Sequence, residues 1–259
     1  MKIAVLIKPV KSELIYPNEK RNEAYLFNPY DLNAFLNCLE IKRKQDCQVI
    51  CMSMGPLESE TLLVKALALG ADDAVLLNDN AFIGSDTVAT TYILGKAFEK
   101  LDNIDLVVCG EKSVDGETGQ VVAGISERLG WICITGIQCI REISEQQAII
   151  NIKEGEVTAD ARIHLPAVIS FRDFNLKQPG ISLLALKRAK QRGITLWKAS
   201  DIDADIRKCG LNGSKTKVLN VENQLVKKEK SVVEGGVTEK VNLIFNMIHK
   251  KNGSLFPAD

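Results

Sequence analysis

The sequence contains only two histidines, His164 and His249, and they lie far apart along the chain. We expect the first in a strand and the second in a terminal helix. A zinc site that uses histidine and a Ser-His-Asp centre both need histidine beside their other groups, so neither is expected. Because no set of acid, base and nucleophile stands out either, we expect no catalytic residue, no metal site, and a carrier or binding role.

Excess charge of one sign and long apolar runs are also absent. The 33 basic and 33 acidic residues balance, so no overall field favours nucleic acid or a membrane. The apolar run at residues 1–7 is too short for a signal or membrane segment and predicts a first strand. Seven cysteines without C-x-x-C spacing are typical of reduced thiols, which predicts a cytoplasmic protein.

The common phosphate-binding loops are missing as well. The sequence has no Walker-type glycine-lysine loop and no complete G-x-G-x-x-G. Phosphoryl transfer by a P-loop and ordinary dinucleotide dehydrogenation are therefore weak interpretations.

Strand-like and helix-like patterns alternate through the first half of the chain. Apolar runs at 3–7, 48–54, 74–77 and from Asp105 predict strands, and helical patterns follow each of them. This alternation predicts an α/β fold with a doubly wound, mostly parallel sheet. Asn28 fits a helix N-cap, Gly70 a left-handed C-cap, and Ser85 or Asp86 the cap of a helix to about residue 101.

The second half has a different pattern. Closely spaced apolar segments at 133–140, 148–153, 160–163 and 167–171 predict a small antiparallel β excursion. Residues 201–236 have low hydrophobicity, and the helix after them carries Val237, Val241, Ile244 and Ile248 on one stripe. We therefore expect an α/β domain at 1–200 and, at 201–259, an extended C-terminal arm and helix that pack on a partner.

The turn between the strand at Asp105 and the helix near Val121 is the strongest candidate site. Glycines at 110, 116 and 119 let the backbone approach a ligand, and the N–H groups of the first helical turn can bind phosphate. Ser113, Thr118 and Gln120 add hydrogen-bonding side chains. The alternative is a capped helix that follows a strand and binds nothing.

Two other regions bear on function. The strand ends at Lys8, Gly55 and Gly110 are expected at one carboxyl edge of the sheet, together with the helix starts near 28 and 84, which predicts a composite site. Leucines at 183, 184 and 186 precede a basic run at 187–192, and they pack either in the core or in a docking loop.

Several motifs in fixed order resemble the β subunit of electron transfer flavoproteins over nearly the whole chain. They are Ile7-Lys8-x-Val10, Asn28-Pro29-Tyr30-Asp31, Ser53-Met54-Gly55-Pro56, Gly84-Ser-Asp86-Thr87, Cys109-Gly110 with Asp115-Gly-Glu-Thr-Gly-Gln-Val, Leu165-Pro-Ala-Val, and Gly210-Leu-Asn-Gly-Ser214. The resemblance implies a heterodimer with an α subunit that holds an electron-transferring FAD, and a second adenine nucleotide in the β subunit.

The family has two branches. In one, the β subunit holds AMP as a structural element; in the other, it holds an FAD that takes a hydride from NADH and splits the electrons between two acceptors. The Asp115 loop and the segments at Gly84 and Gly210 look like the FAD-holding branch, so FAD is the implied cofactor and AMP the alternative. Pro9 and the pair Glu111-Lys112 depart from the family pattern. These departures argue against NADH oxidation more than against nucleotide binding.

The resemblance also implies roles for individual residues. Leu183 aligns with a leucine that docks into acyl-CoA dehydrogenase partners; ferredoxin or flavodoxin are further acceptors if electrons are split. Asp86 and Thr87 should face the extended half of FAD. The cofactor-binding residues are Leu6, Lys8, Asn28, Pro29, Tyr30, Asp31, Met54, Asp86, Thr87, Cys109, Gly110, Ser113, Val114, Asp115, Gly116, Glu117, Thr118, Gly119, Gln120 and Val121.

Two other functions fit part of the sequence. A redox-silent sensor that binds AMP or ATP accounts for the sheet and the turn, but not for the arm or the complete motif order. An adenylate-forming ligase is disfavoured because its His-x-Gly-His and Ser-Gly-Gly-x-Asp-Ser motifs are absent. The sequence thus favours an electron-transfer subunit over a stand-alone enzyme.

Overall fold

The computed structural model describes residues 1–259 except 18, 20–22, 176, 218–234 and 252–259, and only the backbone at 154 and 247–251. The chain divides into two units, Met1–Lys217 and Val218–Asp259. In the second unit, the described part contains helix α8 (Val237–Lys251). Most of the expected arm, at 218–234, lies outside the described residues.

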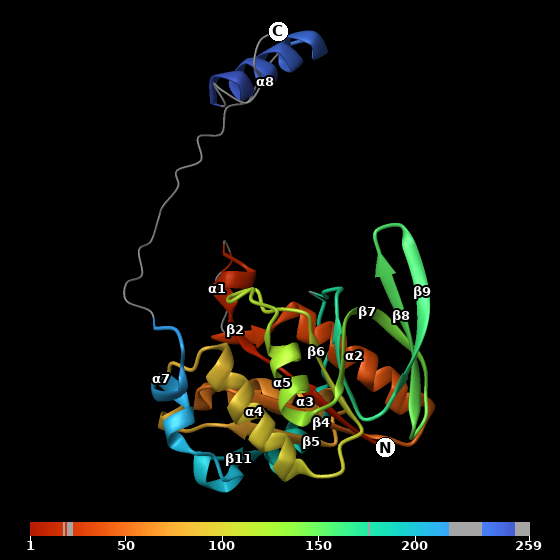
Figure 1. Cartoon of the computed structure of the whole chain (residues 1–259), viewed down its shortest axis with the longest axis vertical. Helices are drawn as coiled ribbons and strands as arrows, with labels where there is room; N and C mark the ends of the chain where they lie inside the picture. The colour runs from red at the N-terminus through yellow and green to blue at the C-terminus, as the bar shows by residue number, and fades with distance from the viewer. Residues whose placement is uncertain (18, 20–22, 176, 218–234, 252–259) are drawn as a thin grey trace. The chain divides into compact units, whose positions relative to one another are not determined.

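The first unit is built on a large sheet (Figure 1). Among the described residues, its strand order is β11-β5-β4-β1-β6-β10-β7-β8-β9. Every pair from β11 to β7 is parallel, and β7, β8 and β9 are antiparallel, which confirms the predicted sheet with its antiparallel excursion. The strands are β1 (Lys2–Leu6), β4 (Gln48–Met54), β5 (Asp73–Leu77), β6 (Leu106–Gly110), β7 (Ile132–Ile143), β8 (Gln147–Glu154), β9 (Val157–His164), β10 (Ala167–Phe171) and β11 (Thr195–Trp197).

Helices cover both faces of this sheet and bury two apolar cores. One core joins the sheet to α2 (Pro29–Lys44), α3 (Glu60–Leu69) and α6 (Leu183–Arg192); the other joins it to α4 (Thr87–Leu101) and α5 (Val121–Leu129). Alternate residues of the central strands point into alternate cores, as strand geometry requires. The remaining elements are β2 (Pro9–Lys11), α1 (Ser12–Ile15), β3 (Tyr25–Phe27), η1 (Leu57–Ser59), η2 (Asn80–Phe82), η3 (Ala199–Ile202), η4 (Ile206–Lys208) and α7 (Gly210–Gly213).

The order of the strands reverses at β1. From β1 the chain adds β4 and β5 on one side, and it then returns to place β6 on the other side of β1. Helices that follow β1 and β6 therefore leave on opposite faces, so a crevice opens at the carboxyl ends of these two strands.

Two strands differ from expectation. The prediction that 167–171 belongs to the antiparallel excursion is wrong, because β10 pairs in parallel with both β6 and β7. All five of its residues are buried, which is typical of a central parallel strand covered on both faces. The sequence analysis did not predict β11, a three-residue edge strand.

Two caps differ in detail from expectation, and the cap of α4 is confirmed. Asn28 occupies the N-cap position of α2, but its side chain makes no capping hydrogen bond. Of the two alternatives at α4, Asp86 is the cap and accepts a hydrogen bond from the Ala89 N–H. Gly70 ends α3 at a φ of 129°, which is positive but outside the left-handed helical region.

The expected domain boundary at 200 also changes. Residues 201–217 contain η4 and α7 and belong to the first unit, which extends to Lys217. Side-chain hydrogen bonds hold this polar segment on the sheet unit, and its low hydrophobicity gave no sign of them. Within the described ranges, no helix combines the length and apolar character that a membrane crossing requires.

Candidate functional site

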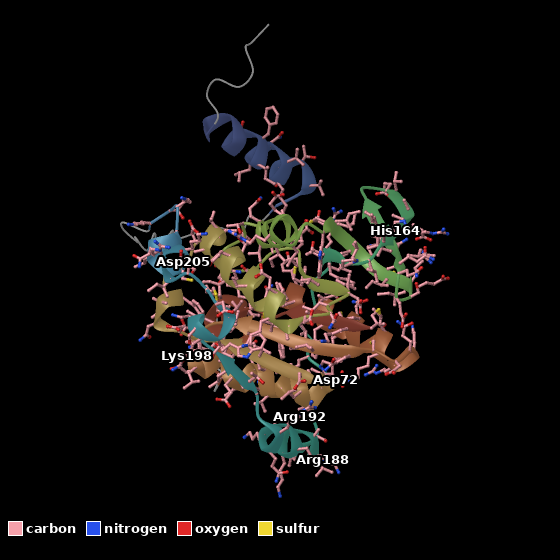
Figure 2. The ribbon with its side chains drawn as sticks, turned by 60° about the horizontal axis from the view of Figure 1, so that its bottom comes forward. Asp72, His164, Arg188, Arg192, Lys198 and Asp205 are labelled. Atoms are coloured by element: carbon pink, nitrogen blue, oxygen red, sulfur yellow. The ribbon has the colours of Figure 1, made fainter. Side chains whose placement is uncertain are left out.

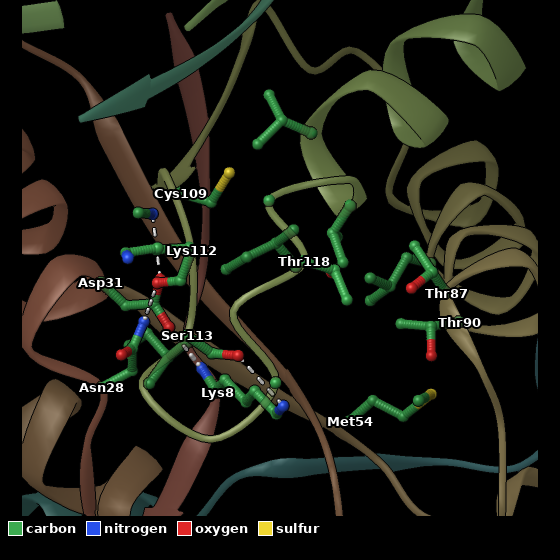
Figure 3. A pocket seen from close by; sticks show the side chains of 18 of the residues that line it. Lys8, Asn28, Asp31, Met54, Thr87, Thr90, Cys109, Lys112, Ser113 and Thr118 are labelled. Carbon is green, nitrogen blue, oxygen red and sulfur yellow. Dashed lines mark hydrogen bonds between the residues drawn. The ribbon is translucent and has the colours of Figure 1, made fainter. Parts of the chain in front are cut away.

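A cavity of about 340 Å³ opens at the crevice between β1 and β6. Its walls come from the ends of β1 and β4, the turn after β6, and the first turns of α4 and α5. Figure 3 shows Lys8, Asn28 and Asp31 on one side of this cavity, and Thr87 and Thr90 on the other. The ends of β1, β4 and β6 and the helix starts near residues 28 and 84 thus meet at this cavity as predicted, although Gly55 and Gly84 do not line it.

Asp31 links the ends of the two strands that flank the crevice. One carboxylate oxygen accepts a hydrogen bond from the Lys8 N–H at 2.8 Å, and the other accepts one from the Gly110 N–H at 2.9 Å. Burial raises the pKa of Asp31 to about 6, although these two backbone donors lower it. The residue thus fixes the width of the crevice at its base.

The raised pKa of Asp31 predicts how stability changes with pH. Because the folded-state value lies above the ordinary 3.8, the folded protein binds more protons between these values, and the free energy of unfolding falls as pH rises through them. The contribution of Asp31 to the free energy of unfolding is complete below its pKa in the unfolded state. It is lost above its pKa in the folded state, a change of about 3 kcal/mol.

Asp31→Asn removes this titration. We expect the stability difference between wild type and Asp31→Asn, measured by urea unfolding, to shrink as pH rises from about 4 to about 6 and then to level off. A difference that grows with pH over this window would contradict the assignment.

Asn28 and Lys8 hold the turn that follows β6. The Asn28 side-chain amide donates to the Lys112 carbonyl at 2.9 Å, and its oxygen accepts from the Val114 N–H at 3.3 Å. Lys8 Nζ lies 2.7 Å from an Asp115 carboxylate oxygen and donates to Ser113 Oγ at 3.3 Å. Partial burial opposes ionisation of Asp115, but the hydrogen bonds from Lys8 and Ser113 hold its pKa below the ordinary value.

The N terminus of α5 is the best anion-binding element of the cavity. No side chain caps it, in contrast to α4, and Gly119, Val121 and Val122 at this end line the cavity. A Cβ added to Gly116 would meet nothing closer than Ser113 Oγ at 3.4 Å, so the space beside this glycine belongs to the cavity. Free N–H groups and an open backbone suit a phosphate or pyrophosphate.

The opposite wall is formed by α4. Thr87, Thr90 and Leu94 follow one another at helical spacing along it and line the cavity, and α4 packs beside α5. The Asp86 carboxylate accepts hydrogen bonds from backbone groups of Ala89, Lys215 and Thr216. Burial opposes ionisation of Asp86, but these bonds hold its pKa below the ordinary value.

Most of the residues predicted from the sequence meet in this cavity. Those that line it are Leu6, Lys8, Asn28, Asp31, Met54, Asp86, Thr87, Cys109, Gly110, Ser113, Gly116, Thr118, Gly119 and Val121. Asp115, Glu117 and Gln120 belong to the turn but do not line the cavity. Pro29, Tyr30 and Val114 line a different cavity of about 180 Å³, together with Leu14, Ile15 and Phe174.

The position of Tyr30 has a local cause. In α2, the side chain of Tyr30 points away from that of its neighbour Asp31, because successive residues of a helix project about 100° apart. The ring of Tyr30 instead packs on Phe174, with ring centroids 5.7 Å apart.

Nine further residues line the cavity that were not predicted from the sequence. Helical spacing from Thr87 would have found Thr90 and Leu94, and strand adjacency would have found Ile7, Met52 and Ser53. The other missed residues are Ser85, Glu111, Lys112 and Val122.

The leucines at the start of α6 differ strongly in exposure. Leu183 is 86% exposed and Leu184 57%, whereas Leu186 packs against the core, so the core interpretation holds only for Leu186. The segment is a helix capped by Ser182 rather than a loop. Figure 2 shows Arg188 and Arg192 on this helix, which makes the exposed leucines part of a basic surface.

Comparison with known proteins gives a consistent result. The electron transfer flavoprotein domain matches residues 19–202. The chain is 31% identical to the electron transfer flavoprotein subunit beta of Clostridium acetobutylicum over 249 residues, which cover 96% of this chain and 93% of that protein. It is 34% identical to Protein FixA of Azorhizobium caulinodans over 239 residues, 89% of this chain and 85% of that protein.

A third relative is named as part of a larger assembly. The chain is 35% identical to the caffeyl-CoA reductase-Etf complex subunit CarD of Acetobacterium woodii over 195 residues, 74% of each protein. With a doubly wound sheet, a crevice at its switch point and these matches over most of its length, the chain belongs to the electron transfer flavoprotein family and is of the β-subunit type.

Proposed function

We propose that this chain is the β subunit of a heterodimeric electron transfer flavoprotein that binds FAD in the crevice between β1 and β6. In this role it passes electrons between NADH or a dehydrogenase and partner redox proteins. Membership of the family supports the electron-transfer role. The cofactor, the direction of transfer and the partners are the parts that we propose.

The lining of the cavity, which includes α4 as well as the start of α5, supports the choice of FAD over AMP. A nucleotide monophosphate needs only the side at Lys8 and the α5 terminus. The same cavity is also lined by Thr87, Thr90 and Leu94 on α4. A dinucleotide cofactor uses this further wall, whereas AMP leaves it empty; AMP as a structural element is the alternative.

The residues that line the cavity fit FAD. Gly116, Gly119 and the uncapped end of α5 would hold the pyrophosphate, and Lys8 and Ser113 lie beside them. When bound, FAD supplies the acceptance and release of electrons. The chain contributes binding and orientation, and the apolar side chains of Met54, Leu94 and Val122 exclude water from the same cavity.

Anaerobic reduction of the purified complex tests the direction of transfer. We expect flavin absorbance to bleach with NADH, with an acyl-CoA dehydrogenase reduced by its substrate, or with both. Bleaching by the dehydrogenase alone would assign a simple carrier role to the complex. Failure of both donors would contradict the proposed function.

Leu183 is proposed to dock into the dehydrogenase. An apolar side chain this exposed gains most when a partner desolvates it. Leu183→Ala should therefore weaken docking by about 1 to 3 kcal/mol, seen as a higher KM for the dehydrogenase at unchanged flavin content. Leu57→Ala, at another exposed leucine, is the control. Equal transfer kinetics for wild type and Leu183→Ala would assign no docking role to Leu183.

Helix α8 is proposed to pack on the α subunit. Val237, Val241 and Ile244 lie exposed on this helix and form an apolar stripe that a partner can cover. Val241→Asp would place an unpaired charge in the interface and should raise the Kd of the heterodimer at least about tenfold. Val157→Asp, at an exposed valine on β9, should leave that Kd unchanged. The same Kd for both variants would place the interface elsewhere.

A further inference from the structure

The chain leaves the first unit through a short segment that is fixed to α4. Asp86 Oδ2 accepts hydrogen bonds from the Lys215 N–H at 2.6 Å and from the Thr216 N–H at 2.9 Å, and the Thr216 hydroxyl lies 3.2 Å from the same oxygen. The Asp86 N–H donates to Ser214 Oγ at 2.8 Å, and that hydroxyl donates to the Gly84 carbonyl at 3.0 Å. Residues 214–216 stand just before the end of the unit at Lys217.

Asp86 also stands at the start of α4, the helix that forms one wall of the cavity. Asp86 Oδ1 accepts from the Ala89 N–H at 3.0 Å and so caps α4, whose next residues, Thr87 and Thr90, line the cavity. One carboxylate oxygen thus holds the first turn of α4, and the other holds the segment that leads to the C-terminal part of the chain. Both oxygens are occupied by protein donors, so Asp86 has little capacity left for a ligand.

We propose that Asp86 is a positioning residue that couples occupancy of the nucleotide cavity to the order of residues 214–217, from which the C-terminal arm departs. The inference rests on the proposed function, because the nucleotide is the ligand that contacts α4. It differs from the sequence expectation, in which Asp86 contacts FAD itself.

The coupling has a direct physical path. A nucleotide against Thr87 and Thr90 stabilises the first turn of α4, and Asp86 keeps both of its hydrogen-bonded groups in place only while that turn is formed. Linkage is reciprocal: whatever orders residues 214–217, such as binding of the α subunit, must then tighten nucleotide binding by the same factor.

Asp79 offers a matched control. It also caps a helix, η2, and its second oxygen also holds a later segment, through the Ala199 N–H at 3.0 Å. Asp79 does not line the cavity and does not hold residues 214–217. Asp79→Asn and Asp86→Asn therefore remove similar tethers at different places.

The test uses the full-length chain co-purified with its α subunit, with the β nucleotide bound and after its removal. Hydrogen exchange is followed in the peptide that covers 214–217, and the rate of nucleotide release is measured by ultrafiltration. In wild type we expect the nucleotide to slow exchange of this peptide. In Asp86→Asn, exchange should be at least about tenfold faster and no longer respond to nucleotide, and release should be faster by a similar factor. Asp79→Asn should behave as wild type in both measurements.

Two outcomes would overturn the inference. Faster exchange with unchanged release would make Asp86 a structural tether alone. Faster release with a normal response of 214–217 to nucleotide would make it a direct ligand. A wild-type complex that carries no nucleotide in the β chain would contradict the proposed function itself, and the inference with it.

Discussion

Gly116→Val is expected to empty the β nucleotide site while the protein remains folded. An added Cβ at this position meets Ser113 Oγ at 3.4 Å and Lys8 Nζ at 3.7 Å, which are ordinary contacts, so the fold tolerates the larger side chain. The valine methyl groups instead occupy space that the cavity offers to a ligand. Overlap of this kind costs about 1 to 3 kcal/mol, or roughly a ten- to hundredfold loss of nucleotide affinity.

The measurement is nucleotide content together with the thermal unfolding temperature. Gly116→Ala should give an intermediate loss of nucleotide, because its single methyl group enters less of the cavity. The flavin of the α subunit should stay bound in both variants. Full retention of the β nucleotide in Gly116→Val would show that the ligand does not approach this part of the turn.

Among the substitutions proposed for this protein, Gly110→Val is expected to lower the free energy of unfolding most. Gly110 ends the buried strand β6, and a Cβ there would overlap Tyr30 and approach Asp31 Oδ1 to 2.7 Å. The valine therefore displaces the carboxylate that bonds to Lys8 and Gly110. Overpacking and two backbone donors left without an acceptor together cost at least about 3 kcal/mol.

Gly180→Val is the control for this prediction. A Cβ at Gly180 meets nothing within 4 Å, so its effect on stability should stay within about 0.5 kcal/mol. Urea unfolding at neutral pH compares both variants with wild type. Similar midpoints for Gly110→Val and wild type would contradict the role of Asp31 as the link between β1 and β6.

Local patterns in the sequence predicted the elements well where one interaction dominates. Buried apolar runs predicted β1, β4 and β6, and the cap of α4 was narrowed to Ser85 or Asp86, because these features depend on residues close in sequence. They did not reveal the partners of β10, since its place in the sequence directly after the antiparallel segments suggested those as neighbours, although its five buried residues are typical of a parallel strand.

For the side chains of the site, too, the sequence did not reveal hydrogen-bond partners that are distant along the chain. Asn28 is a good N-cap residue, yet its side chain forms hydrogen bonds with Lys112 and Val114, more than eighty residues later in the chain. Asp86 was predicted from its motif, but its bonds to Lys215 and Thr216 depend on a segment far away in sequence. Composition and spacing identify which residues gather at the crevice; the fold decides which of them face the cavity.

The cofactor content of the purified heterodimer tests the central claim most directly. Acid precipitation releases bound nucleotides, and chromatography then quantifies FAD and AMP for each dimer. We predict two FAD per heterodimer, one from each subunit, because the cavity is lined by α4 as well as by the start of α5. One FAD with one AMP would contradict the account and leave this chain as the structural subunit of a simple electron carrier.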